Sequence, residues 1–167
     1  MPYLLDSSVF IQAKRLHYGM DFCPAFWDWL DEQNRKGVVF SIEKVAEELQ
    51  AGDDELSDWA GQKSNSFFLA PDQQMLASLT AVTQWVQNQS YRVAAVQAFF
   101  QDADYYLVAH ALAHNHVVVT HEVPSDGVKQ VKIPNVCIGV HVRFMNPFAM
   151  LRVEKAKFVL GERSRQT

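Results

Sequence analysis

Four acidic residues stand at comparable places in the pattern of predicted strands and helices. Asp6 and Glu122 follow short apolar runs of the kind that form buried strands. Glu48 lies in the predicted helix after a second apolar run, and Asp104 opens the predicted helix before the last one. In a parallel sheet these positions can converge at the carboxyl edge, where open α/β sheets bind their ligands.

Four carboxylates in one place would have a definite chemistry. They would repel one another and raise each other's pKa values unless a cation compensates. Hard divalent cations such as Mg²⁺ or Mn²⁺ suit an oxygen-only site, and such a cation lowers the pKa of a bound water and stabilises charge on a phosphodiester. Spacing alone is weak evidence for this site, because acids at strand ends and helix caps are common.

The elements that must position these acids alternate along the chain. Short apolar or β-branched runs predict strands over residues 3–5, 38–40, 67–69 and 117–119. Helical patterns fall between them, including residues 21–35, 42–52 and a stretch that Asp72 opens. This alternation predicts a parallel sheet with helices on both faces.

Several local features have specific predictions. Ser7 or Ser8 is expected to cap the helix after the first strand, and Ser41 the helix after the second. Residues 133–137 are expected to be extended because they contain a proline. Asn146, followed by a proline, predicts the start of a last helix.

Composition and charge limit the class of protein. The 167 residues, 49% hydrophobic, predict one globular domain over residues 1–160 and a flexible polar tail over 161–167. A net charge of −4 argues against a broad electrostatic nucleic-acid binder, and two cysteines argue against a disulfide framework. With neither a secretory signal nor a run of ~18 apolar residues, a cytoplasmic protein without a membrane segment is expected.

Four motifs resemble those of PIN-domain proteins. Residues 3–11, YLLDSSVFI, look like the family's opening strand, which ends in Asp before a small polar pair. Residues 45–49, VAEEL, resemble its V-x-x-E-L motif, and residues 104–112 are similar to its D-x-x-I/L-x-A-x-A-L helix. Residues 118–122, VVTHE, match its V-V-T-x-D/E strand end.

The order and spacing of these motifs fit across residues 1–122. The C-terminal part, with residues 132–137 and 150–152, resembles a PIN-like branch of unknown function. The resemblance implies a three-layer α/β/α fold with a central parallel sheet of about four to five strands.

The resemblance also implies an activity. It implies that Mg²⁺ or Mn²⁺ is held by four acids, namely Asp6, Glu48, Asp104 and Glu122. The hydroxyls of Ser8 and Thr120 would support these ligands, and Asp102 is a further supporting residue. The implied reaction is hydrolysis of RNA by metal-activated water, leaving a 5′-phosphate. The implied setting is a prokaryotic toxin–antitoxin-like module of the VapC type, with an antitoxin-like partner protein, and it leaves a homodimer open.

The sequence departs from the family at two site positions. PIN toxins often have Asn where Ser8 stands and usually Asp where Glu122 stands. These changes and the overall acidity favour an alternative, a PIN-like interaction or regulatory module with little nuclease activity. Asp102 and Glu47 are rivals of Asp104 and Glu48, but only Asp104 keeps the following apolar register, and Asp102 is left as a capping or supporting residue.

Other site hypotheses have less support. His110 and His114 are four residues apart and have His116 and His121 nearby, but they lack the H-E-x-x-H order of a zinc helix. Ordinary surface or core histidines explain them more simply. A haloacid-type phosphatase would need a second Asp at the position of Ser8, and neither G-x-G-x-x-G nor a P-loop occurs.

Basic and aromatic residues follow the first strand. Lys14 and Arg15, with Phe10 and His17, would suit single-stranded RNA through phosphate contact and stacking. An amphipathic helix with a solvated basic face explains the same residues equally well.

Overall fold

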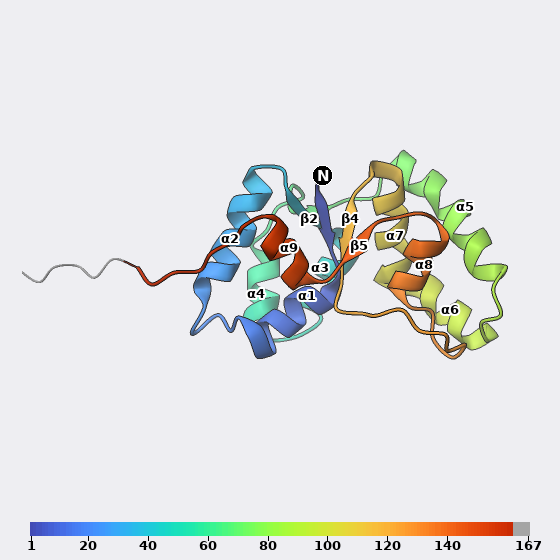
Figure 1. The fold of residues 1–167 in the computed structure, drawn as a ribbon, viewed down its shortest axis with the longest axis horizontal. Helices are drawn as coiled ribbons and strands as arrows, with labels where there is room; N and C mark the ends of the chain where they lie inside the picture. The colour runs from blue at the N-terminus through green and yellow to red at the C-terminus, as the bar shows by residue number, and fades with distance from the viewer. Residues whose placement is uncertain (162–167) are drawn as a thin grey trace, which may run out of the picture.

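A parallel sheet runs through the middle of the computed structural model, which describes residues 1–161 (Figure 1). In this part of the chain the sheet has five strands in the order β3-β2-β1-β4-β5. Their bounds are β1 Tyr3–Leu5, β2 Val39–Ile42, β3 Phe68–Leu69, β4 Val117–Val119 and β5 Phe144–Met145. The predicted tail, residues 161–167, falls outside the described residues except for Gly161.

Strand β1 is the central strand, and it pairs in parallel with β2 and β4. Leu4 lies opposite Phe40 on one side and Val118 on the other. Every residue of β1 and β4 is buried, as expected for apolar strands covered on both faces. Because all five strands run the same way, the residues that follow them meet at one edge of the sheet.

Helices cover both faces of the sheet, which confirms the predicted three-layer α/β/α arrangement. In Figure 1, α5 to α8 lie on one side of the sheet, and α2, α4 and α9 lie on the other. The helices are α1 Ser7–Gln12, a π-helical turn η1 Ala13–His17, α2 Pro24–Arg35, α3 Glu43–Gln50, α4 Glu55–Gly61, α5 Gln73–Gln87, α6 Val93–Gln101, α7 Ala103–His114, α8 Ile133–Gly139 and α9 Pro147–Val153. Within residues 1–161, none of them has the length and apolar character needed to cross a membrane.

Two of the predicted helix starts are confirmed by side-chain caps. Asp72 accepts a hydrogen bond from the Met75 N–H at 2.8 Å, and Asn146 accepts one from the Ala149 N–H at 2.8 Å. Each cap satisfies a backbone donor that the first turn of a helix leaves free.

The serine caps were predicted wrongly. Asp6 occupies the N-cap position of α1, so Ser7 and Ser8 already lie inside the helix. Ser41 lies inside β2, where its hydroxyl donates to the Leu5 carbonyl at 2.6 Å, and Ile42 is the N-cap of α3. A hydroxyl that has a partner across the sheet is not available to a helix end.

The C-terminal third differs most from the prediction. Residues 133–139 form helix α8 rather than an extended segment, because Pro134 lies in the first turn, where its missing N–H is not needed. Strand β5 was not predicted at all. It is only two residues long, and both are partly exposed, so it lacks the apolar run that identified the other strands.

Candidate active site

Five carboxylates gather around one hollow at the carboxyl edge of the sheet. The hollow has a volume of about 310 Å³. The four predicted acids line it together with Asp102, and its other lining residues are Ser7, Ser8, Ile11, Gln12 and Gln130. The acids come from the end of β1, from α3, from the start of α7 and from the segment after β4, so the sheet brings together residues up to 116 positions apart.

Asp6 is the buried acid of the group, with only 3% of its surface exposed. Its Oδ2 atom accepts hydrogen bonds from Ser8 Oγ at 2.8 Å and Thr120 Oγ1 at 2.9 Å. Burial raises the pKa of Asp6, and the hydroxyl donors act in the opposite direction. These bonds fix the orientation of the carboxylate.

The two hydroxyls also join the ends of neighbouring strands. Ser8 Oγ accepts the His121 N–H at 3.2 Å, and Thr120 Oγ1 accepts the Glu122 N–H at 3.1 Å. The segment after β4 is therefore tied to the Asp6 carboxylate through short side chains. Ser8 and Thr120 stand where the family resemblance placed supporting hydroxyls.

The pKa of Asp104 is raised from its ordinary value of 3.8 to about 9. Burial is the largest cause, followed by the negative charges of Asp6, Asp102, Glu122 and Glu48. At neutral pH the Asp104 carboxyl therefore keeps its proton in the metal-free protein.

Glu48 and Asp102 form the more open side of the hollow. Partial loss of water, followed by the neighbouring Asp102 carboxyl, raises the pKa of Glu48 to about 7. Asp102 is the N-cap residue of α7, yet its side chain makes no capping hydrogen bond. The structure therefore does not support Asp102 as a side-chain cap, and places it beside the predicted ligands.

Glu122 is held from the C-terminal third of the chain. Its Oε2 atom accepts the backbone N–H of Ile133, in the first turn of α8, at 2.8 Å. Burial raises the pKa of Glu122, while the Ile133 N–H and the nearby Lys132 lower it. The sequence did not predict this contact, because a proline-containing segment at residues 133–137 was expected to be extended and instead begins α8.

Gln12 and Gln130 line the hollow but were not predicted. The position of Gln12 gave a usable signal, because it lies four residues after Ser8 on the same helix and so on the same face. Gln130 lies in the loop before α8, where no periodic pattern marks it.

The donors fit a hard divalent cation in type but are not yet arranged around one. Within residues 1–161, no three His, Cys, Asp or Glu side chains form a ready-made metal-holding group. The carboxylates around the hollow nevertheless offer only oxygen atoms, and burial followed by neighbouring negative charge raises the pKa values of Asp104 and Glu48, an effect that positive charge would offset. A divalent cation would supply that charge.

Lys14 and Arg15 lie beside the acids. They line a second hollow of about 120 Å³ that shares Ile11 and Glu48 with the first. Lys14 Nζ is 3.0 Å from Asp54 Oδ2 at the surface, and Arg15 is exposed. Both cations therefore line a hollow that adjoins the acidic one.

The aromatic part of the RNA-binding prediction is wrong for Phe10. This side chain is fully buried and packs against Trp59, Phe67 and Phe68 in the core. His17 is exposed and lies near His121, with ring centroids 5.7 Å apart.

Comparison with known proteins supports the fold. The profile of a family described as "Domain of unknown function (DUF4411)" matches residues 3–158. No curated protein matches the sequence.

Three solved structures share the architecture. A chain of VapBC2 from Rickettsia felis, bound to a promoter DNA fragment, has a TM-score of 0.56 and 13% identity over 87% of this chain and 98% of that one. FitAcB from Neisseria gonorrhoeae gives 0.56 and 18% over the same shares. A FitAB complex bound to the IR36 DNA fragment gives 0.53 and 16%, over 87% and 95%. At these identities the likeness establishes the PIN-like α/β/α fold.

Proposed function

The chain belongs to the DUF4411 family, and from its carboxylate hollow we propose that it is a divalent-metal-dependent endoribonuclease that uses Mg²⁺ or Mn²⁺. One observation carries the proposal: five carboxylates from separate elements line one hollow, and the pKa of Asp104 there is raised to about 9. Acids that lie close together without positive charge destabilise the folded protein. A divalent cation bound among them in the active protein would offset this repulsion, which explains why five acids line one hollow.

Asp6 and Asp104 are the principal ligands in this proposal. Asp6 is held in place by Ser8 and Thr120, and Asp104 gives up its proton when a cation binds. Glu48 and Glu122 complete the site or hold a second cation through water. When bound, the cation supplies an acidic water and positive charge against the phosphodiester.

Glu48 has a second use in the proposed reaction. With a pKa of about 7 and Asp102 beside it, this carboxyl exchanges a proton near neutral pH. That is the property needed to accept a proton from an attacking water. Lys14 and Arg15, across the shared wall at Ile11, are placed to contact a phosphate next to the one that is cleaved.

A protein partner and a setting are part of the proposal. Two of the similar structures are described as VapBC2 and FitAB bound to DNA fragments. By analogy we propose that this chain is the toxin-like member of a toxin–antitoxin module in a prokaryotic cytoplasm, with an antitoxin-like partner. A homodimer is a further proposal from the same family resemblance.

Cleavage of RNA and metal-linked stability together test the proposal. Purified wild-type protein should cleave structured or single-stranded RNA only with Mg²⁺ or Mn²⁺, and Mn²⁺ should raise its unfolding temperature. Asp6→Asn and Asp104→Asn should lose both effects, while Glu47→Gln, a change at the exposed neighbour of Glu48, should keep them. A folded wild-type protein with neither effect would instead support the interaction or regulatory module.

A further inference from the structure

Three histidines form a cluster at the end of α7 opposite the carboxylates. The ring centroids of His110 and His114 are 4.7 Å apart, those of His110 and His116 are 5.5 Å apart, and those of His114 and His116 are 6.0 Å apart. Imidazoles that share one tetrahedral metal ion have ring centroids roughly 5 Å apart, given metal–nitrogen distances of about 2.0–2.1 Å. These centroid distances are compatible with a shared metal ion, and they also fall within the range of about 4.5–7 Å of packed aromatic rings, so the spacing does not carry the argument alone.

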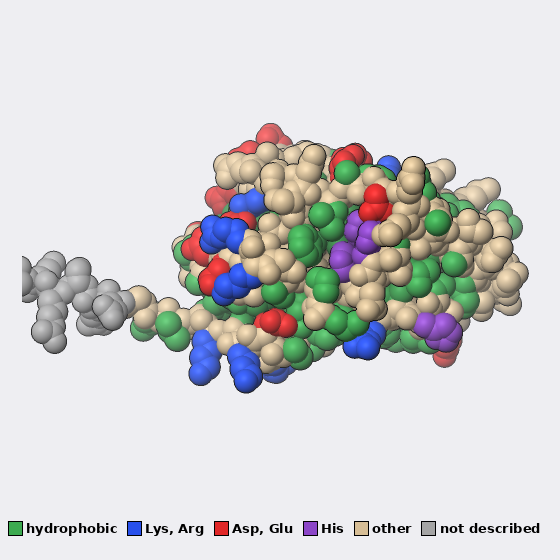
Figure 2. Space-filling model, turned by 90° about the horizontal axis from the view of Figure 1, so that it is seen from above, with side chains coloured by type: hydrophobic (Ala, Val, Ile, Leu, Met, Phe, Trp, Pro, Cys, Tyr) green, Lys and Arg blue, Asp and Glu red, His purple; other side chains and the backbone are tan. Residues whose placement is uncertain are grey.

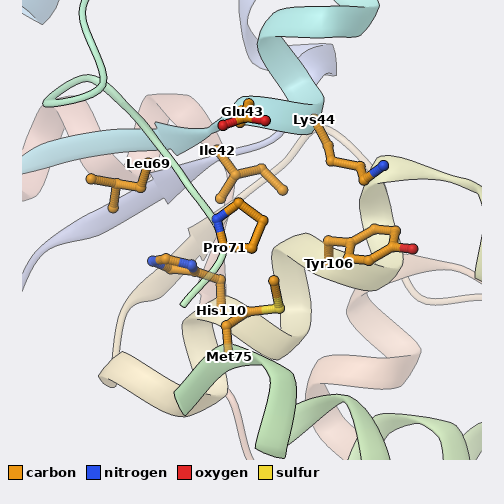
Figure 3. Close-up of a pocket in the computed structure, with 8 residues that line it drawn as sticks. All are labelled: Ile42, Glu43, Lys44, Leu69, Pro71, Met75, Tyr106 and His110. Carbon is orange, nitrogen blue, oxygen red and sulfur yellow. The ribbon is translucent and has the colours of Figure 1, made fainter. Parts of the chain in front are cut away.

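The cluster is reached from the surface at the amino edge of the sheet. Figure 2 shows histidine side chains gathered near the middle of this face, beside an acidic side chain. His114 keeps 26% of its side-chain surface, whereas His110 is almost fully buried. Figure 3 shows His110 beside Pro71 and Met75. The cavity that these residues help to line has a volume of only about 10 Å³, too small for an organic ligand.

Asp72 orients one of the three rings. Its Oδ2 atom lies 2.7 Å from His114 Nε2, so the proton of that ring is held on Nε2 and Nδ1 is left with its lone pair. Metal-binding histidines commonly donate their second N–H to a carboxylate in this way. This arrangement fits Asp72 as the partner that holds His114 ready to bind through Nδ1.

A second observation points to a missing partner at His116. Its Nδ1 atom is buried and has no hydrogen-bond partner among residues 1–161. A buried polar atom without a partner carries a free-energy cost that a ligand would remove. Together, His114 and His116 give two nitrogens with no other role, on rings packed against the same neighbour, His110.

We propose that His110, His114 and His116 bind a transition-metal ion of the Zn²⁺ class, with Asp72 as the positioning residue for His114. Imidazole nitrogen favours such ions over Mg²⁺, which prefers oxygen. The described side chains do not form a finished metal group. Binding therefore requires the rings of His110 and His116 to turn about their Cβ–Cγ bonds until a nitrogen of each faces His114 Nδ1, while Asp72 keeps the His114 ring in place. The site is separate from the carboxylate hollow and does not depend on the nuclease proposal.

Zn²⁺ titration of the tag-free chain tests this site. To exclude the carboxylates, calorimetry at pH 7.5 would compare wild type with Asp104→Asn; the variant should bind one Zn²⁺ per chain, and any further Zn²⁺ in wild type should be lost in it. His114→Gln and His116→Gln should each weaken binding at least ~10-fold, and Asp72→Asn, which can still cap α5, about 10-fold. His141→Asn removes an exposed histidine at a backbone position that Asn tolerates, and should leave binding unchanged.

X-ray absorption on zinc-loaded wild type decides the result even if a variant does not fold. The spectrum should show about three imidazole ligands. An oxygen-only shell, no stoichiometric binding, or equal affinity in folded His114→Gln would overturn the proposal. Because Asp104→Asn is expected to lose RNA cleavage and keep Zn²⁺ binding, failure of one proposal is distinguishable from failure of the other.

Discussion

Helix α7 has a cluster of titratable side chains at each end, and the two clusters differ in the space around them. At the first turn, Asp104 joins the acids that line a hollow of about 310 Å³. At the last turn, the rings of His110, His114 and His116 lie against one another, beside a cavity of only about 10 Å³. The acidic end faces an open hollow, whereas the histidine end is closely packed and only His110 of the three reaches the small cavity.

The same physical effect neutralises both clusters. Loss of water disfavours the charged form of either kind of group, so it raises the pKa of Asp104 to about 9 and lowers those of His110 and His116 to about 4. Near pH 7 the metal-free protein thus holds a protonated acid at one end of α7 and neutral imidazoles at the other. A perturbed pKa alone therefore does not distinguish the two ends, and our proposal of catalysis at the acidic end rests on its open hollow.

The largest expected effect comes from Asp104→Asn. The change should lower RNA cleavage at least ~10²-fold, because it removes a principal ligand at the charged centre of the site. Metal-free stability at pH 7 should rise, because the wild-type carboxyl, ionised in the unfolded chain, must take up a proton on folding and Asn need not. Cleavage assays and thermal unfolding of the same preparations check both statements. A large loss of stability at pH 7 would show that Asp104 acts through packing.

The affinity for Mn²⁺ should rise with pH at the acidic end. A cation competes with the protons on Asp104 and Glu48, whose pKa values are raised to about 9 and about 7. Affinity should increase about tenfold per pH unit between pH 7 and pH 9, where one proton must leave. Calorimetry in buffers of different ionisation enthalpy would count that proton. Affinity that does not change with pH would contradict the raised pKa of Asp104.

Metal-free stability should respond to pH with opposite signs at the two ends. The folded-state pKa of Asp104 lies above its ordinary value of 3.8, so this group destabilises the fold progressively as pH rises from about 4 to about 9. The folded-state pKa values of His110 and His116 lie below 6.5, so these groups destabilise it as pH falls from 6.5 toward 4.

Thermal unfolding across pH 4–9 separates the two contributions. His116→Gln should reduce the stability loss below pH 6.5, by about 2–4 °C in unfolding temperature, and leave the alkaline side unchanged. Asp104→Asn should reduce the stability loss toward pH 9 and leave the acidic side of the profile unchanged. If both variants altered the same side of the pH profile, it would be wrong to attribute the alkaline loss of stability to Asp104 and the acidic loss to the histidines.

The smallest expected effect concerns the cations beside the acidic hollow. Lys14→Ala and Arg15→Ala should each weaken RNA binding a few-fold and lower its salt dependence by about one counterion, with little change in the cleavage rate at saturation. Fluorescence anisotropy at several salt concentrations measures this. Lys129→Ala, a change at an exposed lysine outside both hollows, serves as the control.

The sequence predicted best where one residue type has one physical explanation. The apolar run before Asp6 made β1 a buried strand, and Asp72 and Asn146 proved to be helix caps. It predicted worst where a residue has two partners to choose between. Ser41 bonds across the sheet instead of capping a helix, and Pro134 begins a helix that had been expected to be extended.

The same distinction separates the site residues that the sequence predicted from the site contacts that it did not predict. Motif order placed the four acids, and the structure brings all of them to one hollow. Pairwise contacts between distant segments, such as the bond from Ile133 to Glu122, depend on how α8 packs and leave no local signal in the sequence. Gln130 is likewise positioned only by the path of a loop.

The central claim is that the carboxylate hollow binds a divalent cation. Anomalous diffraction from crystals of the wild-type chain grown with Mn²⁺ near pH 8 tests it most directly. We expect a peak inside the hollow, within bonding distance of Asp6 and Asp104. A well-ordered structure with no peak there at millimolar Mn²⁺, or with manganese held only by surface acids outside the hollow, would contradict the claim.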